Sequence, residues 1–282
     1  MFNRFNRRPA QFARPDFTKP GSPNVFSFSF NRSTYNDVPG LVATVGAGVT
    51  PAPDGYKFNG STTGVISFGL TGLEDFAPVG EDLTIFGEFL NTGVSTDRAV
   101  LADYDSGAAN QSIFIGPVTS NAAAFLIWDS TGTQRTLVSG VMPAGSVIRF
   151  LLHHAVGDGM QLDYIIFNAT PISWSTTAVL FTQDRRAGSD LRIGNLGAYT
   201  GGLFFDHKIN FLHLAKGIAA KNMYQMSAQL LLDPYRIYTD GHYISPYALG
   251  PLRGGDFIQS IAGYGGIAGP GGTAGKSGGI AG

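Results

Sequence analysis

The chain has 282 residues, no cysteine and a formal net charge of −1, with 43% hydrophobic and only 14% charged residues. These values exclude a disulfide framework and a thiolate metal site, and they give no overall attraction to nucleic acid or to an anionic membrane. No apolar run reaches the ~18 residues of a membrane helix.

The low charge has a second consequence. An ordinary soluble protein carries about 25% charged residues, and this chain also contains 39 glycines. The combination favours a protein packed into an assembly. The basic N-terminus lacks the apolar core of a signal peptide, so we expect synthesis and assembly in a cytoplasm.

Residues 1–22 are predicted to form an N-terminal anchoring arm. Five basic residues and one acidic residue give this segment a net charge of +4, and four prolines in its neighbourhood oppose a helix. A basic arm for nucleic acid and a disordered terminus are the alternatives, but a solvated tail gains nothing from regularly spaced phenylalanines. The predicted partner-binding residues of this arm are Phe2, Phe5, Arg7, Arg8 and Phe12.

Residues 23–240 are predicted to form an all-β domain, because short strand-like segments recur between Gly, Pro, Asn and Ser. Two segments alternate apolar and polar residues with period two, as half-buried strands do. They are Val25–Phe30 and Leu83–Phe89. Further strands are expected at 41–45, 56–60, 65–68, 112–125, 135–139, 147–154, 162–167, 191–194 and 204–214.

One helix is predicted over residues 217–232, where apolar residues fall at helical spacing and Pro234 follows. We expect it to pack across an edge of the sandwich and to cover unpaired backbone. Residues 241–282 are rich in glycine and are predicted to form a C-terminal arm. Tyr264 and Ile267 are its predicted anchor points on a partner.

The order of these segments resembles the strand order of a known domain family. Phe58-Asn59-Gly60-Ser61 followed by Asp82-Leu83-Thr84-Ile85 resembles the opening of a laminin-G-like, concanavalin A-like jelly-roll domain, and the later strands follow in the family's order. The ending at Tyr224–Tyr238 resembles that of tailed-bacteriophage proteins of this type. The resemblance implies a two-sheet antiparallel jelly roll with one C-terminal helix.

Two positions depart from the family pattern. The family's Trp is missing before His153, and its Asp-Gly is replaced by Phe167-Asn168-Ala169. No ligand site is therefore carried over, and the carbohydrate-binding residues stay unknown. Trp128 and Trp174 fit packing on a sheet, since sugar stacking would need an aromatic exposed near loops.

The residues suited to chemistry do not form a recognisable motif. His153 and His154 point to opposite faces of a strand and cannot share one metal, so we expect one buried and one exposed. Asp103, Asp105 and Asp129 allow a calcium site, but no calcium-loop signature is present, so surface turns explain them better. Nothing pairs two carboxylates as a glycosidase requires, and no nucleophile elbow or phosphate loop is present, so we predict no enzyme.

The sequence therefore predicts a non-enzymatic structural protein of a bacteriophage virion, a capsid or tail decoration, fibre or attachment component held to neighbouring subunits by its arms. A homo-oligomer, in particular a trimer, is expected by analogy with other jelly rolls. The alternative is a carbohydrate-binding module for a host surface glycan, which shares the fold. A polysaccharide-cleaving enzyme is a third hypothesis and would need an acidic pair in a groove.

Overall fold

The computed structural model describes residues 25–29, 43–52, 55–68, 72–91, 93, 97–104, 111–119, 121–167, 174–196, 203–225 and 227–234. The chain divides into two compact units, Met1–Ile244 and Ser245–Gly282, and all described residues belong to the first. The predicted C-terminal arm and the arm of residues 1–22 lie outside the described residues.

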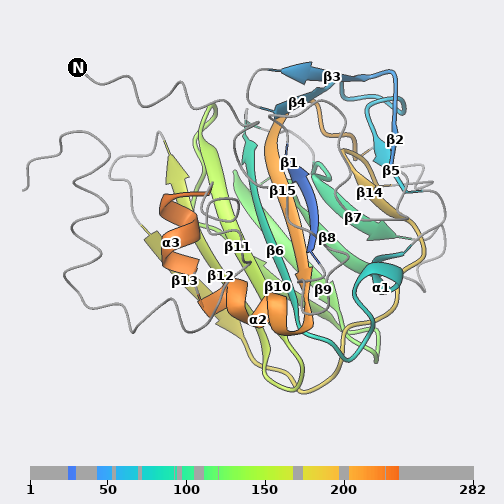
Figure 1. The fold of residues 1–282 in the computed structure, drawn as a ribbon. Coiled ribbons are helices and arrows are strands. Elements are labelled where there is room, and N and C mark those ends of the chain that lie inside the picture. Colours follow the sequence, from blue (N-terminus) through green and yellow to red (C-terminus); the bar gives the residue numbers. More distant parts are fainter. Residues whose placement is uncertain are drawn as a thin grey trace, which may run out of the picture. The chain divides into compact units, whose positions relative to one another are not determined.

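The described residues fold into two antiparallel sheets (Figure 1), which confirms the predicted all-β sandwich. Sheet A has eight strands. Its path runs through β13 (Trp174–Val179), β12 (Gly159–Phe167), β11 (Val147–Ala155), β6 (Leu83–Leu90), β15 (Lys208–Lys216), β4 (Gly55–Phe58) and β3 (Val49–Ala52), and β1 (Val25–Ser29) also pairs with β15.

Sheet B has seven strands and packs against sheet A. Its order is β10 (Gln134–Val138), β9 (Ala122–Trp128), β8 (Gln111–Val118), β7 (Leu101–Tyr104), β14 (Leu191–Ile193), β5 (Ile66–Ser67) and β2 (Thr44–Val45). The predicted strands are found, with shifted ends. Three were not predicted, namely β3, β7 and β13.

The core between the sheets follows from the two-residue period of the strands. In β6, Ile85 and Phe89 are fully buried and face sheet B, and Phe89 meets Phe150 of β11 edge to face at 6.0 Å. Gly87 lies between them on the same face. A Cβ at Gly87 would lie 2.8 Å from the Phe150 ring, so the glycine makes room for that ring.

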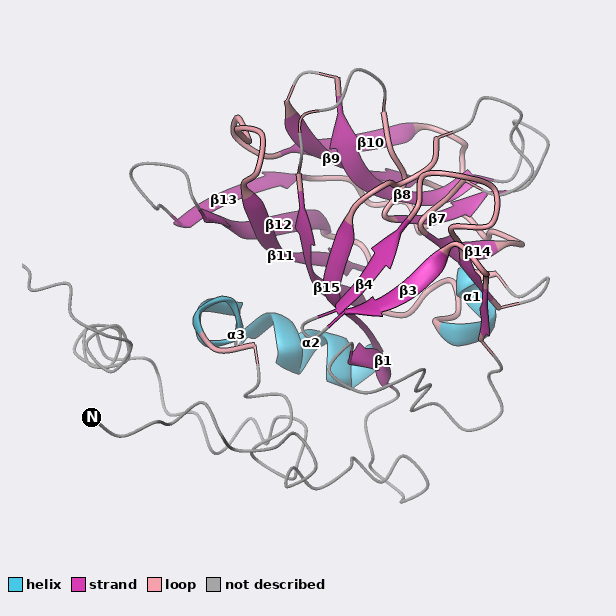
Figure 2. Cartoon of the chain, turned by 90° about the horizontal axis from the view of Figure 1, so that it is seen from above, coloured by secondary structure: helices cyan, strands magenta, loops and turns pink. Residues whose placement is uncertain are grey.

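Three short helices complete the described part of the chain: α1 (Leu73–Phe76), α2 (Gly217–Gln225) and α3 (Ser227–Leu232). Figure 2 shows α2 and α3 on the side of sheet A that faces away from sheet B. The single helix predicted for 217–232 is therefore wrong in detail, because its span holds two helices, of which α2 ends at Gln225 and α3 begins at Ser227. Neither of these, nor α1, has the length and apolar character needed to cross a membrane.

The last strand, β15, has an edge that two strands share. β4 pairs with Lys208 and Ile209, whereas β1 pairs with residues 211–215, and the ladder to β6 shifts register between Ile209 and Phe211. The helix α2 begins at Gly217, directly after β15, in a left-handed conformation with φ 59° that glycine tolerates.

Candidate functional site

The outward face of β12 and β13 carries a half-exposed tryptophan beside polar groups. Register places Asp163 opposite Thr176 and Ile165 opposite Trp174. Since alternate residues share a face, Asp163, Thr176 and Trp174 point away from sheet B together with Gln161. We call these four residues, with Tyr224 of α2, the Trp174 face.

A chain of hydrogen bonds links these side chains. The indole Nε1 of Trp174 donates to Thr176 Oγ1 at 3.2 Å, and Thr176 Oγ1 donates to Asp163 Oδ1 at 2.6 Å. Gln161 Nε2 donates to the same oxygen at 3.2 Å. Thr176 is exposed, Trp174 and Gln161 are half-exposed, and Asp163 is 2% exposed at the base of the group.

Helix α2 contributes Tyr224 beside this carboxylate. The Tyr224 ring stacks on His153 of β11 at 4.3 Å with an angle of 10°. Burial, and then the negative charge of Asp163, raise the pKa of Tyr224 above its ordinary value. The phenol is therefore protonated at neutral pH and is a hydrogen-bond donor at the edge of the face.

His153 is neutral in this setting, since burial lowers its pKa to about 4. Thr84 Oγ1 donates to the carbonyl of Ala220 at 2.7 Å and lies 2.7 Å from His153 Nδ1. A hydroxyl has one proton, so Nδ1–H of His153 donates to Thr84. This bond and the stacked ring hold α2 in place.

Both histidines are buried, which corrects the expectation that one is exposed. His153 is 5% exposed under α2, and His154 is 1% exposed on the opposite face, where its ring stacks on Phe181 at 5.6 Å. The predicted opposite orientation is confirmed. Helix α2, which covers the outer face of sheet A, explains why His153 is buried as well as His154.

A cleft forms a second candidate site where the β9–β10 hairpin meets the segment after β13. Its volume is about 460 Å³. Its floor includes Phe181, whose ring stacks on His154 at 5.6 Å and lies 5.2 Å from the Arg135 guanidinium carbon. The lining residues are Arg135, Gly157, Asp158, Leu180, Phe181, Thr182 and Gln183.

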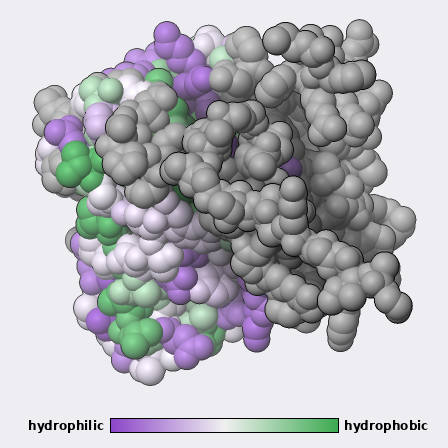
Figure 3. Space-filling model, turned by 90° about the vertical axis from the view of Figure 1, so that its left-hand side faces the viewer, coloured by the Kyte–Doolittle hydropathy of each residue, from purple (hydrophilic) through white to green (hydrophobic). Residues whose placement is uncertain are grey.

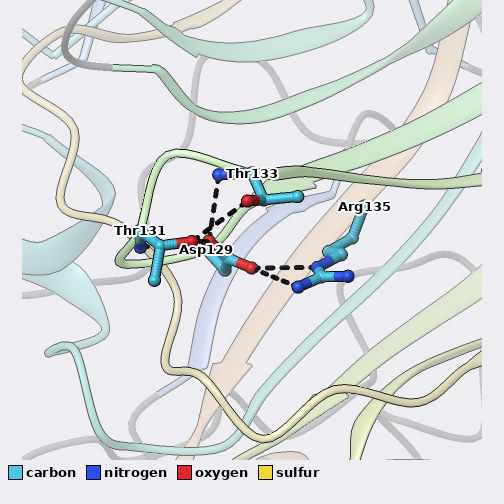
Figure 4. A network of polar contacts seen from close by, with 4 residues as sticks. All are labelled: Asp129, Thr131, Thr133 and Arg135. Carbon is cyan, nitrogen blue, oxygen red and sulfur yellow. Dashed lines mark hydrogen bonds and ion pairs between the residues drawn. The ribbon is translucent and has the colours of Figure 1, made fainter.

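The hairpin turn positions Arg135 (Figure 4). The fully buried Asp129 accepts hydrogen bonds from the backbone N–H groups of Thr131 and Thr133 and from the Thr131 hydroxyl. Its other oxygen accepts from Arg135 Nε at 2.9 Å and Nη2 at 2.7 Å. Burial alone would raise the pKa of Asp129, but these bonds bring it below its ordinary value.

The predicted calcium ligands do not gather around one position. Asp129 is committed to Arg135 and the hairpin, and Asp103 accepts from the backbone N–H groups of Leu73 and Asp190 at 2.6 and 2.9 Å. Asp105 lies outside the described residues. Within the described ranges, no cluster of three or more His, Asp or Glu side chains is suited to a metal.

The predicted partner-binding residues Phe2, Phe5, Arg7, Arg8, Phe12, Tyr264 and Ile267 lie outside the described residues. Sequence reasoning identified Trp174 but placed it in sheet packing, and it did not identify Gln161, Asp163, Thr176 or Tyr224 as site residues. A signal was available in the Trp-Ser-Thr-Thr pattern. It places Trp174 and Thr176 on one face of a strand, but the partner strand that supplies Asp163 is set by register.

No protein-family model matches the chain, and no curated protein sequence matches it. Similar solved structures include the binding domain of Paraclostridial Mosquitocidal Protein 1 (11% identity, TM-score 0.47, 68% of this chain and 47% of that chain). The Botulinum Neurotoxin Type G receptor binding domain has 10% identity and a TM-score of 0.42 over 68% of this chain and 46% of that chain.

A Trypanosoma rangeli sialidase is also similar, with 13% identity and a TM-score of 0.45 over 67% of this chain and 30% of that chain. The chain thus spans less than half the length of each of these three structures. With TM-scores below 0.5 in every case, what this chain does has to be argued from its own side chains. The fold that carries those side chains is a two-sheet antiparallel β-sandwich.

Proposed function

We propose that this chain is a non-catalytic carbohydrate-binding module that holds a neutral glycan on the Trp174 face. The observation that carries the proposal is the half-exposed Trp174 joined through Thr176 to the carboxylate of Asp163. An aromatic ring beside converging polar groups is the arrangement that a ligand with both apolar and hydroxyl surfaces requires.

The chemistry of the face matches a sugar ring. The C–H surface of a pyranose packs on an aromatic ring, while its hydroxyls donate to a carboxylate and accept from an amide or phenol. The exposed Thr176 hydroxyl supplies an acceptor, and Gln161 and Tyr224 supply donors. Asp163 lies buried beneath them and orients Thr176 and Gln161. The charge of Asp163 repels an acidic sugar, so a neutral glycan fits this face better than a sialylated one.

Access to the face is given by the edge of sheet A. Among the described strands, β13 pairs with β12 alone and ends the sheet. Helices α2 and α3 pack over β15, β6, β11 and β12. The exposed Thr176 lies beyond this cover, so a ligand can approach from the edge.

The test is a glycan array with the full-length chain, followed by calorimetric titration of the best neutral ligand. Trp174→Ala should weaken binding about tenfold, because a stacked aromatic contributes about 1 kcal/mol beyond the area that it buries, and lost area adds to this. Thr176→Ala should weaken binding less, since it removes a linking hydroxyl.

The matched control is Val141→Ala, at a side chain that is 72% exposed and outside the Trp174 face. It should leave the dissociation constant unchanged. Equal affinities for the wild type and Trp174→Ala, or binding of acidic glycans only, would refute the proposal. A melting temperature measured for each variant separates lost binding from lost fold.

A place for this module on a bacteriophage virion remains our second proposal. It is supported by the low charged fraction and by the basic, phenylalanine-rich segment at residues 1–22. Removal of residues 1–20 should abolish incorporation into particles, measured by mass spectrometry of purified virions. Undiminished incorporation would rule out anchoring by this arm. It would not bear on glycan binding at the Trp174 face, which is tested separately.

A further inference from the structure

The cleft beside Arg135 has an apolar surface that the described residues leave uncovered. Leu180 lines it and is 83% exposed, the highest value among the large exposed hydrophobic side chains described. Val156, next to the lining residue Gly157, is 37% exposed. Figure 3 shows hydrophobic residues on one face as several separate patches among hydrophilic ones.

The free charge of the cleft is negative. Arg135 already pairs with Asp129, whereas the exposed Asp158, the other charged lining residue, forms no ion pair within the described part of the chain. The cleft therefore presents the aliphatic side chain of Leu180 and one carboxylate above a floor that holds the largely buried Phe181. This surface is complementary to a segment that carries aromatic and basic residues in alternation.

Such a segment exists in the chain itself. Residues 1–22 contain phenylalanines at positions 2, 5, 12 and 17 and a net charge of +4 from five basic residues and one acidic residue. The phenylalanines suit Phe181 and Leu180, and the arginines suit Asp158. Leu180 stays 83% exposed among the described residues.

The register of sheet A brings the arm to the cleft's end of the molecule. Val25, where β1 begins, pairs with Ala215, which pairs with Thr84, which in turn pairs with His153. Two residues after this pair, β11 ends, and the turn that follows contributes Gly157 and Asp158 to the cleft.

The remaining distance is within the reach of the arm. Five strand spacings separate β1 from β13, which amounts to about 24 Å at ~4.8 Å per strand. The 13 residues from Phe12 to Asn24 span roughly 40 Å when extended. An attached arm also has a high effective concentration at a site on its own molecule.

We propose that the cleft formed by Arg135, Asp158, Leu180, Phe181 and Thr182 is the docking site for the N-terminal arm of the same molecule. The arm inserts a phenylalanine against Leu180 and Phe181 and places an arginine at Asp158. The interaction is independent of glycan binding at the Trp174 face, which lies on the outward side of β12 and β13.

Limited trypsin digestion of the full-length protein tests the docking. In the arm, trypsin can cut after Arg4 and Arg7, whereas the bonds after Arg8, Arg14 and Lys19 precede prolines and resist it. Leu180→Asp should make cleavage after Arg7 about tenfold faster, because cleavage follows the fraction of undocked arm. Intact-mass spectrometry reports the rate.

Val141→Asp is the matched control, because it makes the same kind of change at an exposed apolar side chain that does not line the cleft. It should cleave at the wild-type rate. Equal rates for Leu180→Asp and the wild type would overturn the proposal. Because Leu180 is highly exposed, its substitution should not destabilise the fold. A melting curve of each variant verifies this.

A disulfide trap identifies the molecule that supplies the arm. The chain has no cysteine, so the pair Phe12→Cys and Thr182→Cys introduces the only two thiols. Oxidation at low protein concentration should give a cross-linked monomer in higher yield than the control pair Phe12→Cys and Val141→Cys. Linked dimers alone would overturn docking within one molecule.

Discussion

The ion pair of Glu88 and Arg149 is the residue-scale contact most open to test. Arg149 Nε donates to Glu88 Oε2 at 2.6 Å, and its Nη1 donates to the carbonyl of Leu231 at 2.7 Å. Both side chains are largely buried, with 14% and 10% exposed. Arg149→Met leaves Glu88 without its cation, and we expect unfolding free energy to fall by about 3 kcal/mol in urea titrations.

The comparison variant is Arg192→Met. Arg192 pairs with Asp190 through two oxygens, but its side chain is 27% exposed. A solvated pair contributes at most about 1 kcal/mol. Similar losses in the two variants would show that burial does not set the value of these pairs.

Single residues also show what the sequence hides. The alternation in Leu83–Phe89 reveals which side chains of β6 face the core, since it depends on neighbours in sequence alone. The proposed ligand-binding role of Trp174 depends on Thr176, on Asp163 and on the position of β13 at the sheet edge. The last two follow from the pairing between β12 and β13. No local pattern contains that pairing.

At the scale of elements, the hydroxyl of Thr84 helps to attach α2 to sheet A. Thr84→Val removes the bonds to the carbonyl of Ala220 and to His153 Nδ1 together. Two buried polar groups then lack partners, and we expect a loss of about 2 kcal/mol. Hydrogen exchange of the α2 amides should become faster, while exchange in β8 and β9 should change only with global stability.

Thr136→Val provides the control for this element. Thr136 is exposed on β10, and its hydroxyl accepts one bond from Gln134 at 3.0 Å. Stability and exchange in α2 should match the wild type. Unchanged α2 exchange in Thr84→Val would mean that the stacked Tyr224 and the buried leucines of α3 hold the helix without this bond.

The elements missed from the sequence share physical causes. β3 contains Pro51, which a central strand rejects but an edge strand accepts, and β3 is an edge of sheet A. β7 has only four residues and includes the buried Asp103, whose two backbone donors come from distant segments. β13 is polar because it is half solvated. The strands with strong alternation were all predicted.

For the whole molecule, the histidines predict loss of stability in acid. Burial lowers the pKa of His153 and His154 to about 4 and that of His213 to about 3. Each of these pKa values is lower in the folded state than the unfolded value of 6.5. The contribution of each histidine to stability is therefore complete above pH 6.5 and is lost as the pH falls towards its folded-state pKa.

One group acts in the opposite direction. Burial raises the pKa of Asp103 to about 6 from 3.8, so its contribution is complete below 3.8 and is lost as pH rises through 6. Three histidines against one carboxyl give net destabilisation between pH 6.5 and 4. Urea titrations at pH 7 and pH 4.5 should show it, and His213→Phe should make the difference smaller.

Equal stability at the two pH values would contradict this balance.

The overall architecture could be predicted without pairing details. Recurring strand segments and turn residues predicted an all-β domain, and the resemblance of their order to a jelly roll implied two antiparallel sheets. The cover of sheet A by α2 and α3 was predicted only as a helix at a sandwich edge. Its actual place over β6 and β11 is set by tertiary contacts such as Thr84 to Ala220.

The shared edge of β15 determines how the fold carries tension. β1 is joined to it by the five pairs from Val25–Ala215 to Ser29–Phe211, and β15 continues without a loop into α2. A pull on the chain before Val25 along the strand axis loads this ladder in shear, and the force passes through β15 to β6 and to α2. If the N-terminus is tethered, mechanical load therefore reaches the helix that carries Tyr224 before it reaches sheet B.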